Sequence, residues 1–140
     1  MGRTLGEELL EPTRIYALDC LALAHECEVR TFCHVTGGGL VGNMERVIPE
    51  GKVAEMHRAS WEPPQIFRTI RTVGKVPEEE MEKTFNMGVG MVAVVAPEDR
   101  DRALAMLTAR HVDCWEIGVV RTATDEDAGA RATLVGTHVH

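Results

Sequence analysis

Three consecutive glycines, Gly37, Gly38 and Gly39, join a strand pattern to a helix pattern, and this junction restricts the folds open to the 140-residue chain. Residues 29–35 alternate and are rich in β-branched side chains, which is typical of a strand. Residues 40–47 then predict a short helix that ends before Pro49. A strand that turns so tightly into a helix excludes an all-helical protein and indicates a mixed α/β domain.

Other segments add strands and helices to this unit. Residues 91–96 are a continuous apolar run and the clearest strand in the chain, which we expect at the centre of a sheet. Further strands are predicted at residues 53–57, 115–122 and 132–137, and helices at 15–28, 65–73, from 77 and at 97–110, the first of them starting within residues 11–14. We expect an α/β (α+β) fold with one mixed β-sheet of about five to seven strands, flanked by about four helices.

Size and composition indicate one soluble domain over residues 1–140. Hydrophobic residues make up 44% of the chain, and no segment approaches the roughly 18 uninterrupted apolar residues of a membrane span. The N-terminus lacks the apolar core of a secretory signal, so we expect neither export nor a membrane partner. Cys20, Cys27, Cys33 and Cys114 form no C-x-x-C pair, which predicts buried or half-buried thiols in a reducing cytoplasm.

The charge balance limits the partners of the chain. The net charge is −7, and aromatic residues make up only 4% of the sequence, so positive charges are not interleaved with stacking rings. A nucleic acid polymer is therefore disfavoured. An anionic small molecule can still bind an acidic protein, provided that backbone amides and a few cations are placed locally.

The glycine loop, residues 36–39, is the most specific candidate for such a site. Bare main chain before a helix offers N–H donors, so Thr36, Gly37, Gly38 and Gly39 are candidates for binding phosphate or substrate. The loop matches neither the G-x-G-x-x-G fingerprint nor the P-loop. The alternative is a tight strand-to-helix turn whose glycines are needed for positive φ.

His34, at the predicted strand end beside this loop, is the candidate catalytic residue. An imidazole can act as a general acid or base, or donate a hydrogen bond to a developing oxyanion. The alternative is a structural histidine bonded to backbone. We expect His25, His57 and His111 at the surface or at helix ends. His138 and His140 lie too near the end of the chain to argue from, and no histidine pair has metal-ligand spacing in a helix.

Three further residues are candidates for ligand binding. Asn86, in the loop before the apolar run, could bind an amide or hydroxyl, or it could simply cap a bend. Thr13 and Arg14 could bind phosphate or carboxylate from the first turn of a helix, or form an ordinary cap and ion pair.

The remaining polar and aromatic features favour structural roles. The Glu78–Glu80 run predicts a solvated helix start and not a metal site, because hard cations draw their ligands from loops. Trp61 beside Pro63 and Pro64 predicts a corner that buries the ring. No metal site is therefore expected in the chain.

Taken together, several segments resemble one enzyme family. The segments are Leu9-Leu10-Glu11-Pro12-Thr13-Arg14-Ile15-Tyr16, His34-Val35-Thr36-Gly37-Gly38-Gly39-Leu40 with Asn43 and Arg46-Val47-Ile48-Pro49, Trp61 with Pro64, Ile66 and Phe67, and Thr84-Phe85-Asn86-Met87-Gly88-Val89-Gly90-Met91. In this order, from about Leu9 to Val120, they resemble the C-terminal domain of the phosphoribosylformylglycinamidine cyclo-ligases (aminoimidazole ribonucleotide synthetases). Single elements recur in related ATP-dependent enzymes, but the full set is similar to the cyclo-ligases.

The resemblance implies a function in de novo purine biosynthesis. In this family ATP phosphorylates the formyl amide oxygen of formylglycinamidine ribonucleotide, and a nitrogen then closes the imidazole ring and expels phosphate. It implies an N-terminal domain that binds ATP and Mg²⁺ and forms a homodimer. It also implies that His34, Thr36 and Asn86 line the substrate cleft.

No segment of this sequence matches that N-terminal domain, so we expect the isolated chain to be inactive. Two other readings stay open. One is a stand-alone phosphate- or nucleotide-binding module of the same superfamily, and the other is a purely structural or interaction domain.

Overall fold

The computed structural model describes residues 2–139, and Met1 and His140 lie outside the described residues. Within that range the elements are α1 (Leu5–Leu9), α2 (Ala17–Glu26), β1 (Val29–His34), α3 (Gly39–Met44), β2 (Lys52–His57), η1 (Arg58–Ser60), α4 (Gln65–Gly74), α5 (Glu78–Thr84), β3 (Met91–Val95), η2 (Pro97–Asp99), α6 (Arg100–Ala109), β4 (Gly118–Thr122), η3 (Asp125–Asp127) and β5 (Ala132–Val135). The predicted α/β class is confirmed.

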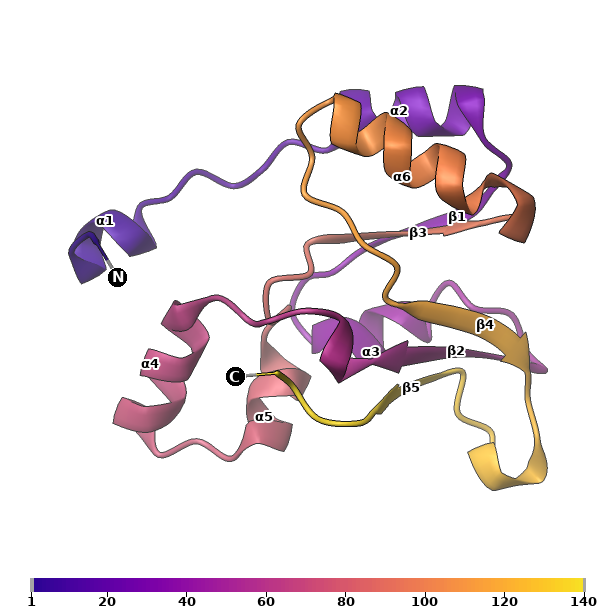
Figure 1. Cartoon of the computed structure of the whole chain (residues 1–140). Coiled ribbons are helices and arrows are strands. Elements are labelled where there is room, and N and C mark those ends of the chain that lie inside the picture. The colour runs from indigo at the N-terminus through magenta and orange to yellow at the C-terminus, as the bar shows by residue number, and fades with distance from the viewer. Residues whose placement is uncertain (1, 140) are drawn as a thin grey trace.

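The five described strands form two sheets (Figure 1). β2 is the central strand of one sheet, antiparallel to β4 and parallel to β5. β1 and β3 form an antiparallel pair whose register shifts between Val29 and Thr31. The number of strands agrees with the prediction, whereas the expected single sheet is divided in two, and the described residues form six α-helices where about four were expected.

The apolar strand β3 is not at the centre of a sheet, and that prediction was wrong. Its one strand neighbour among the described residues is β1. Ala93 and Val95 pack against a cluster formed by Leu23 of α2 and Ala103 of α6, while Val92 belongs to the main core. A continuous apolar run indicates that both faces of a strand are covered by other residues. Here helices cover one face, so the run needs no second neighbouring strand.

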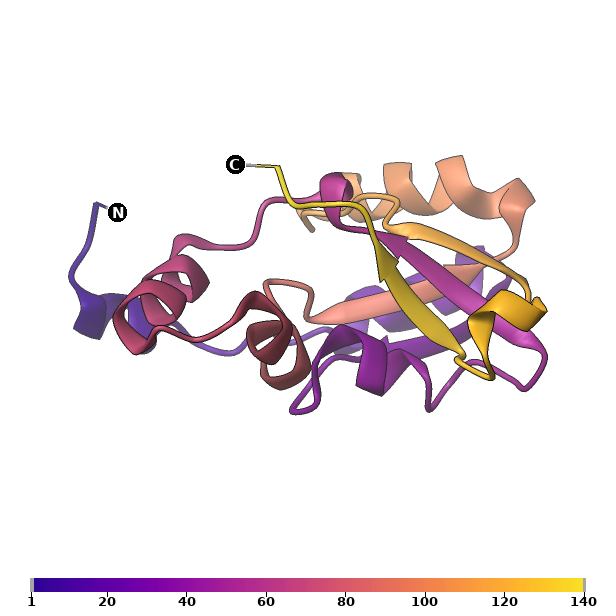
Figure 2. The same cartoon turned by 90° about the horizontal axis from the view of Figure 1, so that it is seen from below.

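The main core brings together side chains from the two sheets and from α3 and α5. Its buried members are Cys33, Val35, Leu40, Met44, Ile48, Ala54, Met56, Trp61, Met81, Met87, Val89, Val92 and Ala132. Each large side chain buried in this way contributes about 1.5–3 kcal/mol. Figures 1 and 2 show α4 and α5 together at one end of the strands, where the C-terminal segment also ends.

The N-terminal region departs most from the prediction. Residues 11–16 are not helical, and α2 begins at Ala17, so the helix start expected within residues 11–14 was wrong. Pro12 disfavours a helical conformation at Glu11. Tyr16 holds the segment in place, because its hydroxyl lies so close to Gly90 that a Cβ there would be 1.8 Å from Oη. α1 begins instead at a capping box formed by Thr4 and Glu7.

The remaining elements lie close to their predicted bounds, except that the strand expected at residues 115–122 begins at Gly118. None of the helices within residues 2–139 is both long and apolar enough to cross a membrane. The four cysteines are unpaired, and Cys27 and Cys33 are buried. The predicted free, partly buried thiols are thus confirmed.

Candidate functional site

Three segments that are distant in the sequence meet at the end of β1. His34 is the last residue of β1 and is exposed, and its register partner on β3 is Met91. The next residue, Val35, donates its N–H to the carbonyl of Gly90 at 2.9 Å. The ring of Tyr16 meets the His34 imidazole edge-on, with 6.1 Å between the ring centroids. The N-terminal segment, the end of β1 and the loop before β3 therefore share one surface.

The glycine loop is held from its inner side by Asn43, a buried residue of α3. The Nδ2 group of Asn43 donates to the carbonyl oxygens of Thr36, Gly37 and Gly39, at 3.1, 3.3 and 2.7 Å. Its Oδ1 accepts a hydrogen bond from the Thr36 hydroxyl at 3.2 Å. Reasoning from residue chemistry gave Asn43 no role, although it belongs to the segment that carries the family resemblance. It fixes the shape of the candidate loop.

The three glycines have different structural reasons to be glycine. Gly38 and Gly39 adopt φ of +98° and +72°, which disfavours any other residue. A Cβ on Gly39 would also lie 1.8 Å from the carbonyl oxygen of Glu82. Gly37 has neither constraint, because its φ is not positive and the space around its Cβ position is open. The tight-turn interpretation therefore accounts for Gly38 and Gly39 but not for Gly37.

Asn86 uses one side of its amide to shape a turn. Its Oδ1 accepts the N–H of Gly88 at 2.9 Å, and its backbone carbonyl accepts the N–H of Val89 at 3.0 Å. Gly88 has a φ of +96° and packs against the ring of Pro64. Within the described residues the Nδ2 group of Asn86 has no hydrogen-bond partner, so it remains available to a ligand carbonyl or hydroxyl.

Thr13 and Arg14 are exposed in the segment between α1 and α2. In the part of the chain that the structure describes, neither side chain forms a hydrogen bond or an ion pair. The ordinary helix cap and surface ion pair considered for them are therefore not formed. The exposed guanidinium of Arg14, two residues before Tyr16, is therefore available to an anion.

A second polar cluster surrounds Glu82 and was missed by the sequence reasoning. Arg58 holds Glu82 through two bonds, Nε to Oε1 at 2.8 Å and Nη2 to Oε2 at 2.9 Å. His138 is only 7% exposed; its Nε2 lies 3.2 Å from Oε1 of Glu82, and its Nδ1 lies 3.2 Å from the carbonyl of Arg58. The ring of His138 also meets the ring of Trp61 edge-on, and Trp61 is buried as predicted. The C-terminal segment is thereby joined to α5.

The ionisation of this cluster follows from its contacts. Burial of Glu82 opposes its charge, but the hydrogen bonds and charge of Arg58 and His138 outweigh burial and lower the pKa of Glu82. The hydrogen bonds that Arg58 donates to Glu82 raise the pKa of Arg58. The partners lie 24 to 80 residues apart in the sequence, so no local motif indicates them. His25, His57 and His111 are exposed, as expected.

Two cavities of about 340 Å³ each border this second cluster. Glu78 and His138 line both of them. The first continues along Arg68 and Arg71 of α4, and the second along Arg58. His34 and the exposed residues 36–38 of the glycine loop line neither of these two cavities.

The fold and these loops define an α/β domain with a glycine loop between β1 and α3 and a second loop before β3. Residues 2–130 match the model of the family "AIR synthase related protein, C-terminal domain". The chain belongs to this family.

Relatives of known name support the assignment. The chain is 55% identical over 134 residues to a Streptomyces fradiae protein named "Putative phosphoribosylformylglycinamidine cyclo-ligase", covering 96% of the chain and 74% of that protein. It is 52% identical over 125 residues to the phosphoribosylformylglycinamidine cyclo-ligase of Anaeromyxobacter sp. strain Fw109-5, covering 89% of the chain and 36% of that enzyme. For the Burkholderia vietnamiensis cyclo-ligase the identity is 42% over 127 residues, with shares of 91% and 36%. The chain thus spans little more than a third of the last two.

Proposed function

We propose that the chain is the substrate-side domain of an ATP-dependent cyclo-ligase that converts formylglycinamidine ribonucleotide to aminoimidazole ribonucleotide in de novo purine biosynthesis. The observation that carries the proposal is the meeting of residues 13–16, 34–39 and 85–90 on one surface. These are the segments in which the chain resembles the cyclo-ligases. Residues 1–140 would fold as one domain, and a separate N-terminal domain would bind ATP.

The chemistry requires an amide oxygen to leave, and transfer of a phosphoryl group from ATP makes it a leaving group. The attacking nitrogen loses a proton as the ring closes, and phosphate departs with the oxygen. His34 is exposed at this surface and can exchange a proton or donate a hydrogen bond to the oxygen. The free Nδ2 group of Asn86 can orient a carbonyl or hydroxyl of the substrate.

The phosphate of the ribonucleotide is assigned to the main chain of the glycine loop and to Arg14. The Thr36 hydroxyl donates its proton to Oδ1 of Asn43, so the donors proposed for the phosphate are the backbone N–H groups of the exposed Gly37 and Gly38. The unpaired guanidinium of Arg14 supplies the positive charge that an acidic chain must place locally. Thr13 lies beside it in the same exposed segment.

The Mg²⁺ that accompanies ATP does not fit the residues of this surface. His34, Thr36, Asn86 and the glycine loop offer no carboxylate, which is the ligand that Mg²⁺ prefers. We therefore assign the binding of ATP and Mg²⁺ to the N-terminal domain.

The apolar N-terminal region is the surface that we propose to contact another domain or subunit. Leu9, Leu10, Ile15 and Leu18 are between 64% and 83% exposed, which is unusual for large apolar side chains that lie together in the sequence. They support a contact with the N-terminal domain or with the second subunit of a homodimer. The four free thiols support a cytoplasmic location.

Binding and turnover test the proposal separately. We expect formylglycinamidine ribonucleotide to raise the melting temperature of the chain, because a ligand at 100 times its Kd adds about 2.7 kcal/mol. Arg14→Ala should remove most of that shift. With ATP and Mg²⁺ added, the isolated chain should form no product. Turnover comparable to that of a full-length enzyme would refute the need for a second domain, and no shift with the ribonucleotide would refute the assigned binding surface.

A second candidate is a stand-alone phosphate- or nucleotide-binding module. It is favoured by the Streptomyces relative, which is short enough that the chain covers 74% of it. This reading predicts equal shifts with the ribonucleotide, simple ribose phosphates and inorganic phosphate. The cyclo-ligase reading predicts a larger shift with the ribonucleotide.

A further inference from the structure

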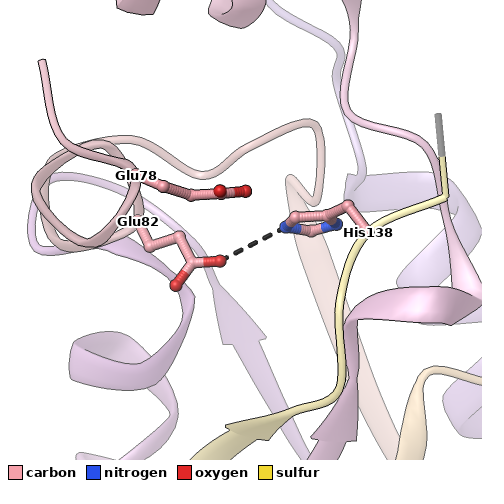
Figure 3. A group of neighbouring side chains, drawn as sticks. All are labelled: Glu78, Glu82 and His138. Carbon is pink, nitrogen blue, oxygen red and sulfur yellow. Dashed lines mark hydrogen bonds and ion pairs between the residues drawn. The ribbon is translucent and has the colours of Figure 1, made fainter.

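We propose that Glu78, Glu82 and His138 form a binding site for a divalent transition-metal ion such as zinc. Both carboxylates extend from α5 toward the ring of His138, which comes from the segment after β5 (Figure 3). The site is separate from His34 and the glycine loop, and the inference does not rest on the proposed cyclo-ligase function.

The three side chains are spaced as metal ligands are. Glu78 and Glu82 stand four residues apart on one helix, which places them on the same face. One donor atom from each of the three residues lies within 4.8 Å of the others. The Nε2 atom of His138 and the Oε1 atom of Glu82 are 3.2 Å apart. Two ligand atoms bound at about 2.0–2.1 Å to a tetrahedral zinc ion are about 3.3 Å from each other.

The hydrogen bond on the far side of His138 determines which nitrogen faces the site. The carbonyl of Arg58 can only accept, so the Nδ1 atom of His138 must donate to it at 3.2 Å. In the neutral ring Nε2 then presents a lone pair to the carboxylate of Glu82. Two acceptors at 3.2 Å require a cation between them, either a proton or a metal ion. A backbone carbonyl that binds the other ring nitrogen is the usual support of a metal-binding histidine.

The 3.2 Å between Nε2 of His138 and Oε1 of Glu82 fits both a proton on Nε2 and a metal ion bound by the two atoms, and metal titration distinguishes them. Arg58 does not block the site, because a carboxylate has about four acceptor positions and the guanidinium occupies two of those on Glu82.

The donor set and the surroundings indicate the class of ion. One imidazole nitrogen with carboxylate oxygens suits zinc and its first-row neighbours, whereas Mg²⁺ and Ca²⁺ prefer oxygen ligands alone. His138 is buried and Glu78 is exposed, so the ion would enter from the side of Glu78. The two cavities that meet at Glu78 and His138 leave room for water or a further ligand on the ion.

The proposed site differs from the expectation that the Glu78–Glu80 run binds no metal. That expectation concerned consecutive residues at the start of a helix. Only Glu78 from the run takes part, and its partners are one helical turn away and at the end of the chain. The buried His138 supplies what the run alone lacks.

Metal titration of the whole chain tests the site. After treatment with a chelator, the protein is titrated with Zn²⁺ by calorimetry and with Co²⁺ by visible absorption. We expect one equivalent to bind, and His138→Gln and Glu78→Gln each to weaken binding at least 10-fold. Glu79→Gln removes the same charge one residue away and should bind as the original chain does. His140→Gln should also leave binding unchanged.

Several outcomes would overturn the proposal. These are no stoichiometric binding by the original chain, unchanged affinity in both ligand variants, or loss of affinity in His140→Gln. Glu78 is exposed, so the variant Glu78→Gln should fold normally. This holds even if His138→Gln, which changes a buried residue, does not fold. Circular dichroism of each variant establishes which of them is folded, and the Glu78 variant then decides the result.

Discussion

Replacing Gly39 by alanine should destabilise the domain more than any change in the neighbouring loop. Gly39 has a φ of +72°, and a left-handed conformation costs about 1–2 kcal/mol for a residue with a Cβ. The added methyl would lie 1.8 Å from the carbonyl oxygen of Glu82, so α3 and α5 must move apart. Forcing extra volume into a packed contact costs about 1–3 kcal/mol. The expected loss is about 2–5 kcal/mol in the free energy of unfolding.

Thermal unfolding followed by circular dichroism measures this loss. For a domain of this size 1 kcal/mol shifts the melting temperature by roughly 3–4 °C, so Gly39→Ala should melt roughly 6–20 °C lower. Gly37→Ala is the matched control, because its φ is not positive and its Cβ meets open space. That variant should stay within about 0.5 kcal/mol of the original chain. Equal melting temperatures for the two variants would refute the described contact between the glycine loop and α5.

Three further predictions concern the core, the acid stability and the thiols. Trp61→Phe removes the hydrogen bond from the indole Nε1 to the Met87 carbonyl and should cost about 1–3 kcal/mol in urea unfolding, whereas no loss would contradict that bond. The contacts of Glu82 lower its pKa in the folded chain below the ordinary value of 4.5. Its ion pairs therefore stabilise the fold fully above pH 4.5, and this stabilisation is lost as the pH falls through the pKa of the folded chain. Urea midpoints measured with chelator present should therefore decline in acid for the original chain, and less for Glu82→Gln; parallel declines would contradict this role. Burial raises the pKa of the Cys27 and Cys33 thiols, so both should react slowly with a disulfide reagent until urea unfolds the chain, and rapid native reaction would show that they are exposed.

Local patterns predicted most elements of the fold, because their causes lie within a few residues. The alternation before the glycines predicted β1, and Pro77 with the acidic residues Glu78–Glu80 predicted α5. The start of α2 could not be found in this way, since Tyr16 is positioned by contacts with Gly90 and His34 from other segments. The pairing of strands could not be predicted from local patterns either. An apolar run indicates that both faces of a strand are covered, but it does not identify the neighbouring strand.

The surface around His34 could be predicted in part from the sequence, whereas the Glu82 cluster could not. His34, the glycines and Asn86 stand in short motifs, and the pairing of β1 with β3 brings those motifs together. The Glu82 cluster has no such motif, because each of its partners comes from a different part of the chain. A histidine near the chain end carries no signal of its own, and only the fold shows that His138 is buried beside Trp61.

A chimeric enzyme tests the central claim most directly. The chain would replace the matching residues of the Anaeromyxobacter cyclo-ligase, to which it is 52% identical over 125 residues, and formation of aminoimidazole ribonucleotide would be measured with ATP and Mg²⁺. We predict that the chimera turns over substrate, and that His34→Asn within it lowers kcat about 100-fold or more without unfolding it. A folded chimera with no activity, or a His34→Asn variant as active as its parent, would contradict the assignment.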